Sequence, residues 1–300
     1  MAVKIVTDST ATLSPEEIAR YDLRLVTLFI VQDGVAEPEI DMDAPAFYAR
    51  LMNLENLPTT SQPTTESMVD AFETILNAGD DVLGIFVSGG LSGTLDGAHA
   101  ARNIIIEKDP AMADRIALVD SQSNAKPLNY VVIAAAQLAS EGATLEECRE
   151  LAEYTTSCTR FLFAPRSLEH LARGGRIGRA SALIGTAIKL VPILGPDKNT
   201  GAVHTYAKVR TYPKALKTIL DKMFEDAAAS GGLKALCVHY IAEKAEAEKY
   251  LEEVVKPAIA EKFPSITPQI AYISPTIGTH VGPAVGIGYC TFNPVAKEKV

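Results

Sequence analysis

The sequence predicts an α/β protein with two domains: an N-terminal three-layer domain built on a parallel sheet, residues 1–158, and a C-terminal α+β domain, residues 159–300. In the first half, short apolar runs alternate with helical runs, which is typical of a parallel sheet with helices on both faces. After Thr159, a hairpin pattern joins the crossover connections, which indicates a second layer of mixed topology. A chain of 300 residues is long enough for both domains.

The first half contains four apolar runs that are expected to form the parallel strands: residues 3–9, 24–31, 80–87 and 115–121. The helices between them are expected after Ser14, over 44–54, after Thr64 or Thr65, over 95–107, over 129–140 and after Thr144. Ser14 and Thr144 each precede a glutamate by three residues, the pattern of a capping box. Residues 57–67 are rich in hydroxyls and prolines, which predicts either a plain loop or a hydroxyl-bearing loop directed at a ligand.

The second half is expected to contain strands at residues 160–165, 188–194, 202–209, 235–241 and 268–273, the second and third of them forming a hairpin. Helices are expected over 167–187, with a break at the Gly174-Gly175 pair, and over 212–230 and 245–263. Residues 274–290 contain several glycines and two prolines, which predicts a loop that leads into a last strand.

Polar residues follow three of the expected parallel strands, at Asp8–Thr10, Ser88–Thr94 and Asp120–Ser121. Ligands of such sheets bind beyond the carboxyl ends of the strands. The segment SGGLSGT, residues 88–94, connects a strand directly to a helix, so it presents free backbone N–H groups together with serine and threonine hydroxyls. We therefore expect an anionic group to bind at this turn.

The composition excludes several classes of protein. A net charge of -9 argues against a general nucleic-acid surface, and no run approaches 18 apolar residues, so no integral membrane association is expected. The N-terminus does not resemble a secretory signal, and the four cysteines are far apart without CxxC spacing, which indicates free thiols and a cytoplasmic protein. The motifs for dinucleotides and ATP are absent, and no two histidines have metal-ligand spacing, so neither a cofactor nor a metal is expected.

Two side chains outside these loops are candidates for binding an anion. Arg176 lies between glycines in RGGRIGR, where its planar guanidinium suits a carboxylate or phosphate, although a solvated helix end is equally compatible. His280 lies in GTHVGP, flanked by Gly278 and Gly282, so its side chain is expected to project into a cleft. The other histidines, including His239, are interpreted as surface residues or as core residues with satisfied hydrogen bonds.

Six motifs occur in an order that resembles the DegV family: TDSTATL, TSQPT, SGGLSGT, VDS, LEHLARGGRIG and SPTIGTHVGP. The resemblance covers nearly the whole chain. It implies a two-domain, cytoplasmic fatty-acid-binding protein without catalysis of its own, with a long-chain fatty acid buried between the domains. It also implies a partner, a fatty acid kinase, that phosphorylates the carboxylate to an acyl phosphate for phospholipid synthesis.

The resemblance also assigns roles to individual residues. Thr60 of TSQPT and Ser92 of SGGLSGT would donate hydrogen bonds to the fatty-acid carboxylate, and His280 would contact or flank it. Arg176 would supply positive charge, and the backbone N–H groups of Gly93 and Thr94 would complete the site. The chain departs from the family at Gly89, where a second serine is common, and in the segment after VDS, which leaves the shape of the acyl pocket open.

Two other functions remain compatible with the residues themselves. An enzyme that acts on a small phosphorylated or carboxylated metabolite would use the same anion site, with His280 as a general acid or base. Such an enzyme requires a short polar pocket, whereas a lipid carrier requires a long apolar pocket leading away from Thr60 and Ser92. A regulatory protein-binding role is compatible with a carrier, because a carrier must dock its kinase.

Overall fold

The computed structural model describes residues 1–54, 56–183 and 190–297. Its first sheet has four strands in the order β2-β1-β6-β7, with bounds Arg24–Val26, Val3–Asp8, Asp81–Phe86 and Ile116–Asp120. Every neighbouring pair of these strands runs parallel. The parallel sheet predicted for the first half is therefore confirmed.

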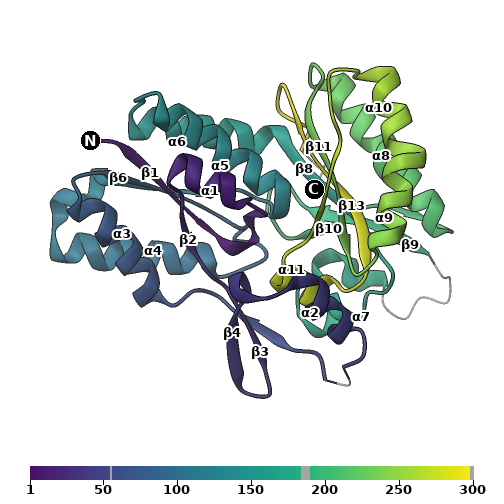
Figure 1. Ribbon diagram of the computed structural model, residues 1–300, viewed down its shortest axis with the longest axis horizontal. Coiled ribbons are helices and arrows are strands. Elements are labelled where there is room, and N and C mark those ends of the chain that lie inside the picture. Colours follow the sequence, from purple (N-terminus) through teal and green to yellow (C-terminus); the bar gives the residue numbers. More distant parts are fainter. Residues whose placement is uncertain (55, 184–189, 298–300) are drawn as a thin grey trace.

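Helices cover both faces of the first sheet (Figure 1). One face packs against α1 (Pro15–Tyr21), α5 (Ala125–Ser140) and α6 (Leu145–Cys158), and the other against α3 (Thr65–Asn77) and α4 (Thr94–Lys108). The caps predicted from the sequence are confirmed: Ser14 and Thr144 form capping boxes, and the Thr64 hydroxyl accepts a hydrogen bond from the Ser67 N–H. The three-layer arrangement follows from these two apolar faces.

The second sheet has six strands in the order β10-β9-β8-β13-β11-β12, with bounds Val203–Val209, Val191–Pro196, Thr159–Pro165, Ala284–Thr291, Leu233–Ile241 and Gln269–Tyr272. β9 and β10 form the predicted antiparallel hairpin, whereas β11 and β12 run parallel, which confirms the mixed topology. Its outer face (Figure 1) packs against α8 (Tyr212–Ala229), α9 (Lys244–Tyr250), a π-helical turn (Leu251–Val255) and α10 (Lys256–Lys262). The exact domain boundary at residue 158 stays a prediction.

The expected strand over residues 24–31 is wrong, because this segment contributes to two sheets. It ends as β2 at Val26 and resumes as β3 (Phe29–Gln32), the central strand of a small antiparallel sheet with β4 (Val35–Pro38) and β5 (Thr59–Ser61). At the break, the Leu28 N–H donates to the Ser9 hydroxyl and the Leu28 carbonyl accepts from the Glu39 N–H. Backbone groups that bond elsewhere cannot continue a ladder, so the strand divides here.

Residues 274–290 begin with a helix rather than the expected loop. Ser274 caps α11 (Pro275–Val281), and Pro275 occupies its first turn, where a proline is tolerated. Gly278 lies inside this helix because a Cβ there would collide with the Tyr48 ring of α2 (Ala44–Leu51). The glycines of this segment thus mark a close helix contact, and His280 lies in the last helical turn instead of in a loop.

The expected helical segment 167–187 is shorter than predicted where it is described. It contains α7 (Glu169–Arg173) and a 3-10 helix (Gly178–Leu183) on either side of the Gly174-Gly175 break. Residues 184–187 of this prediction, and residues 188 and 189 of the strand predicted after it, lie outside the described residues. β9 begins at Val191.

The structure also describes the cysteines, the groups of side chains that could bind a metal, and the length of the helices. All four cysteines are buried and free. Among residues 1–54, 56–183 and 190–297, no group of three or more histidine, cysteine, aspartate or glutamate side chains is placed to hold a metal ion. Of the helices described, none combines the length and the apolar character that crossing a bilayer requires.

Candidate functional site

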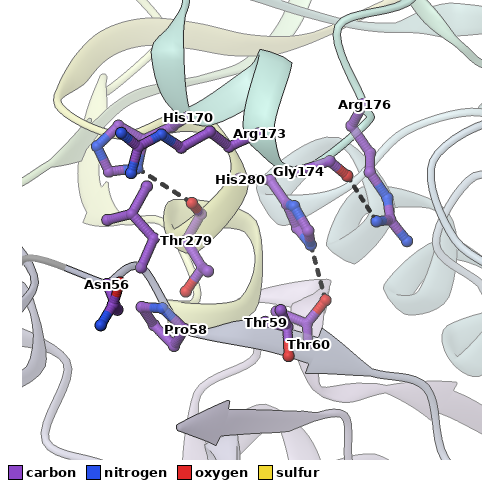
Figure 2. A pocket seen from close by; sticks show the side chains of 11 residues that line it. Asn56, Pro58, Thr59, Thr60, His170, Arg173, Gly174, Arg176, Thr279 and His280 are labelled. Atoms are coloured by element: carbon purple, nitrogen blue, oxygen red, sulfur yellow. Dashed lines mark hydrogen bonds between the residues drawn. The ribbon is translucent and has the colours of Figure 1, made fainter. Parts of the chain in front are cut away.

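A pocket of about 320 Å3 opens where β5, the end of α7 and α11 meet (Figure 2). These elements come from both halves of the chain, because β5 belongs to the small sheet and α7 and α11 flank the second sheet. Three of the predicted site residues line the pocket: Thr60, Arg176 and His280. The structure therefore brings together side chains that are far apart in the sequence. Thr60 and His280 are separated by 220 positions.

Thr60 and His280 are directly paired. The Thr60 Oγ1 and His280 Nε2 atoms lie 2.7 Å apart. The other ring nitrogen, Nδ1, is buried and has no hydrogen-bond partner among the described residues. Burial, together with the positive charge of Arg176, lowers the pKa of His280 to about 4. The ring is therefore neutral at neutral pH and presents one N–H donor and one acceptor nitrogen.

Gly174 determines where the His280 ring can lie. A Cβ built at Gly174 would collide with His280 Nδ1, so the absence of a side chain leaves the space that the ring fills. Gly174 is also the residue at which α7 ends, and its carbonyl accepts a hydrogen bond of 2.7 Å from Arg176 Nη1. One glycine thus positions both the histidine and the arginine of the pocket (Figure 2).

Arg176 connects the pocket to the SGGLSGT turn. Its Nε donates to the Leu91 carbonyl at 3.4 Å, while Nη1 is held by Gly174. Arg173, in the same pocket, forms an ion pair of 2.8 Å with Glu169. Within the described part of the chain, Arg176 has no carboxylate partner, so its positive charge is not neutralised by the protein and is available to an anion.

Ser92, Gly93 and Thr94 are not among the residues that line this pocket. The Ser92 and Thr94 hydroxyls lie 2.8 Å apart and bond to each other, and the Thr94 N–H donates to Ser92 Oγ at 3.3 Å. A Cβ on Gly93 would collide with the side chain of Gln62, two residues after Thr60. The turn therefore lies next to the pocket, with Gln62 packed against the start of α4, and its role toward a ligand stays a prediction.

The beginning of the same turn joins the two halves of the molecule. The Ser88 hydroxyl donates to the Gly201 carbonyl at 2.9 Å, in the loop between β9 and β10. A Cβ at Gly90 would collide with the backbone around Gly201, so only glycine allows this approach. At Gly89, in contrast, a Cβ would make an ordinary contact of 3.4 Å with Asp120. Ser88 and Gly90 thus hold the two sheets together and are not free to contact a ligand.

The polar residue at the end of β1 is likewise engaged in hydrogen bonds within the protein. Asp8 accepts hydrogen bonds from the Thr10 N–H at 2.9 Å and from the Val87 N–H at 2.6 Å. Complete burial raises the pKa of Asp8 to about 6, because water is excluded from the charged carboxylate. These bonds tie the end of β1 to the end of β6, so this predicted polar tip stabilises the sheet edge.

The sequence interpretation missed two features of the site. The sequence predicts a surface or core position for His170, yet this residue lines the pocket and its Nδ1 lies 3.2 Å from the Thr279 carbonyl. The sequence analysis also does not name the residues of the apolar cluster behind the pocket, although a lipid carrier is expected to have an apolar pocket there. The cluster combines residues of the small sheet, α2, α7, α11 and the inner face of the second sheet, among them Leu57, Phe161, Phe163, Leu171, Ile177 and Ile277. The apolar spacing of Leu168, Leu171 and Ile177 in LEHLARGGRIG was a usable signal for it.

Comparison with known proteins gives close relatives over the whole chain. The model of a family described as "Uncharacterised protein, DegV family" matches residues 2–291. A DegV domain-containing protein from Clostridium acetobutylicum is 39% identical over 292 residues, which are 97% of this chain and 98% of that protein. The match therefore includes both sheets and the pocket between them.

Two solved structures share the fold. DegV from Bacillus subtilis, described as a fatty acid binding protein, has a TM-score of 0.83 and 31% identity, covering 97% of this chain and 99% of that chain. A DegV family protein from Thermus thermophilus, described by its fatty acid binding, has a TM-score of 0.78 and 27% identity, covering 97% of this chain and 100% of that chain. The match of a family model to nearly all residues, with relatives of this identity and coverage, shows that the chain belongs to the DegV family.

Proposed function

We propose that this protein binds a long-chain fatty acid between its two halves, with the carboxylate in the pocket of Thr60, Arg176 and His280 and the acyl chain in the apolar cluster behind it. The observation that carries the proposal is the direct Thr60–His280 pair beside the unneutralised Arg176, at the mouth of an apolar interior. Family members from Bacillus subtilis and Thermus thermophilus that share the fold are described as fatty acid binding.

The pocket offers what a carboxylate needs when it leaves water. An ionised group that is removed from water must regain hydrogen bonds from the protein, and bonds to a charged group are the stronger ones. The Thr60 hydroxyl and the Arg176 guanidinium supply such donors on one wall of the pocket. We also retain Ser92, Gly93 and Thr94 as donors, because the bond between Arg176 and Leu91 holds their turn beside the pocket.

Because His280 is neutral, the tautomer of its ring determines which of the two residues, His280 or Thr60, donates the hydrogen bond between them. If Nε2 carries the proton, it donates to Thr60 Oγ1, and the threonine hydroxyl keeps its own proton for the ligand. If Nδ1 carries it, the threonine must donate to Nε2 and has no proton left. We propose the first tautomer for the fatty-acid complex, so that His280 orients Thr60 and does not need to carry a charge.

The surroundings of the carboxylate also support its presentation to a kinase. Arg173 and Arg176, both exposed, lie on the same wall of the open pocket. We propose that a fatty acid kinase in the cytoplasm reaches the carboxylate here and transfers the terminal phosphoryl group of a nucleoside triphosphate to one of its oxygens. The nucleoside diphosphate leaves, and the product is an acyl phosphate for phospholipid synthesis. The arginines would then face a product with more negative charge than the substrate.

We propose binding rather than catalysis for the protein itself. General acid–base catalysis is most efficient when the pKa of the group lies near the operating pH. The pKa of His280 is lowered to about 4, which makes it a weak base and an uncharged hydrogen-bonding group at neutral pH. This supports a carrier over an enzyme acting on a small phosphorylated or carboxylated metabolite.

Extraction of the purified protein followed by mass spectrometry tests the proposal, together with direct binding of palmitate and oleate. We expect a stoichiometric long-chain fatty acid in the sample and saturable binding of both acids after its removal. A protein that releases no fatty acid and binds neither acid would contradict the proposal. Turnover of a short carboxylated or phosphorylated metabolite that is lost in His280→Ala would favour the enzyme instead.

A further inference from the structure

A narrow cavity lies on the other side of α11 from the carboxylate pocket. Its walls include Phe161, Phe163, Ile241, Ile273 and Ile277, which also belong to the apolar cluster that we propose for the acyl chain. α11 separates the two spaces, since Thr279 and His280 line the pocket while Ile277 and Val281 line the cavity. The cavity therefore lies next to the pocket, within the cluster that we propose for the acyl chain.

One wall of this apolar cavity is a histidine. His239 of β11 is only 1% exposed, and neither of its ring nitrogens forms a hydrogen bond of regular geometry with the residues that the structure describes, although the Ala271 backbone lies within reach of the ring. The Phe161 ring meets it edge-on, with the ring centroids 5.5 Å apart. Burial lowers the pKa of His239 to about 3, an effect that the backbone of Ala271 offsets only in part, so the ring is neutral.

His239 lies in the interior of the proposed acyl site, past the end of α11. His239 pairs with Gly286 of β13 and Ile241 pairs with Ala284, the third residue after α11 ends. Two residues along a strand correspond to about 7 Å, so His239 lies about that much farther along the sheet than the pair of Ile241 and Ala284. A Cβ at Gly288 would lie 3.2 Å from His239 Nε2 and 2.7 Å from Pro127 of α5, so the ring is on the sheet face that meets the first domain.

Buried polar atoms are almost always paired, so two unpaired ring nitrogens indicate a missing hydrogen-bonding group. A neutral imidazole offers one donor and one acceptor, and a hydroxyl group is complementary to either. The free space in the cavity, about 10 Å3, is at the lower limit of what one water molecule needs. A plain alkyl chain would leave the histidine unpaired, whereas a chain that carries a hydroxyl would replace such a water.

We infer that His239 is a polar subsite for a mid-chain hydroxyl group, so that the ligands of this protein include hydroxylated long-chain fatty acids. The inference rests on the proposed fatty-acid binding and adds a specificity residue to it. The Phe and Ile side chains around the cavity must move apart to admit the chain, and the hydrogen bond to His239 then fixes the position of the hydroxyl carbon. A site built to pair a hydroxyl discriminates against an analogue that lacks it.

Dissociation constants of the full-length, delipidated protein for stearate, 10-hydroxystearate and 12-hydroxystearate test the subsite. We expect at least one mid-chain hydroxystearate to bind about tenfold or more tighter than stearate. 2-Hydroxystearate, whose hydroxyl stays at the carboxylate, is the ligand control and should show no such gain. Equal affinities for stearate and both mid-chain acids would overturn the inference, whereas failure to bind any of the four acids would overturn the proposed function as well.

Variants of His239 assign the preference to this side chain. In His239→Leu we expect the preference to disappear, while His239→Gln, which keeps a donor and an acceptor, retains part of it. His99→Leu, on the exposed side of α4, is the matched control and should behave as the wild type. A preference that persists in His239→Leu would overturn the inference. If that variant does not fold, the comparison of ligands on the wild type still decides the outcome.

Discussion

The entrance and the interior of the proposed acyl site contain one histidine each, and the surroundings of these two histidines differ. At the entrance, His280 Nε2 is bonded to Thr60 at 2.7 Å beside Arg176, and only Nδ1 lacks a partner among the described residues. In the interior, His239 is buried among aromatic and aliphatic side chains and has no partner in the described structure. The comparison teaches that the carboxylate end is organised before the ligand arrives, whereas the interior still lacks a hydrogen-bonding group.

The largest effect is expected from removing the hydroxyl donors at the entrance. In the double variant Thr60→Ala, Ser92→Ala, each lost hydrogen bond to the carboxylate costs about 1.5–3 kcal/mol, so the affinity for palmitate should fall by roughly a hundredfold or more. Ser61→Ala, in the next position of β5, is the control, because neighbouring side chains of a strand point to opposite faces. A titration with palmitate measures both variants. Unchanged affinity in the double variant would contradict the assignment of these hydroxyls.

The next effect is expected from Arg176. Replacing it in Arg176→Gln removes the unneutralised charge of the pocket, and the affinity for palmitate should fall by roughly ten- to a hundredfold. Arg173→Gln is the comparison, because Arg173 is already paired with Glu169, and its effect should be smaller. Titrations at low and high salt should show a weaker salt dependence in Arg176→Gln. If Arg173→Gln has the larger effect, Arg176 is not the main cation of the site.

The lowered pKa of His239 predicts how the stability of the protein depends on pH. This pKa is about 3 in the folded protein and about 6.5 in the unfolded chain, so between about pH 6.5 and about pH 3 only the unfolded chain gains a proton. The folded state therefore loses stability as the pH falls below about 6.5, by roughly 2 kcal/mol at about pH 5. The buried Asp8, whose pKa is raised to about 6, acts in the opposite direction and partly hides this loss.

Urea unfolding of His239→Gln isolates the contribution of the histidine. The free energy of unfolding should decrease less between about pH 7.5 and about pH 5 in this variant than in the wild type. His99→Gln, at an exposed position, should keep the wild-type pH dependence. The same pH dependence in His239→Gln and the wild type would show that folding does not lower the pKa of His239.

The smallest effect is expected at Gly174. Gly174→Ala places a Cβ against His280 Nδ1, so the ring must move and the bond to Thr60 weakens. The affinity for palmitate should fall by roughly tenfold, the equivalent of one hydrogen bond. Gly89→Ala is the control glycine, because a Cβ there makes only ordinary contacts. Wild-type affinity in Gly174→Ala would mean that the placement of the His280 ring does not control binding.

The sequence predicted those parts of the fold that depend on local signals. The caps at Ser14, Thr64 and Thr144 require only residues within the first turn of each helix, and they are present as predicted. The break between β2 and β3 depends instead on Ser9 and Glu39, which bond the backbone of Leu28 from other parts of the chain. α11 was missed because its internal Gly278 indicated a loop, whereas the glycine is needed for contact with Tyr48.

In the candidate site, too, the sequence does not predict the features that depend on contacts between distant parts of the chain. Thr60, Arg176 and His280 were placed together from motifs, and the structure brings all three to one pocket. The turn with Ser92, Gly93 and Thr94 was expected to converge on them, but the contacts of Gln62 and of the loop after β9 determine its position, and both are tertiary. His239 was expected to be a surface or satisfied core residue, and only the packing around it shows that it is buried without a partner.

A crystal structure of the protein with bound stearate tests the central claim most directly. We predict that one carboxylate oxygen lies within hydrogen-bond distance of Thr60 Oγ1, that the guanidinium of Arg176 faces the carboxylate, and that the acyl chain runs behind α11 toward His239. A carboxylate bound elsewhere, or an acyl chain outside the apolar cluster of the two halves, would contradict it.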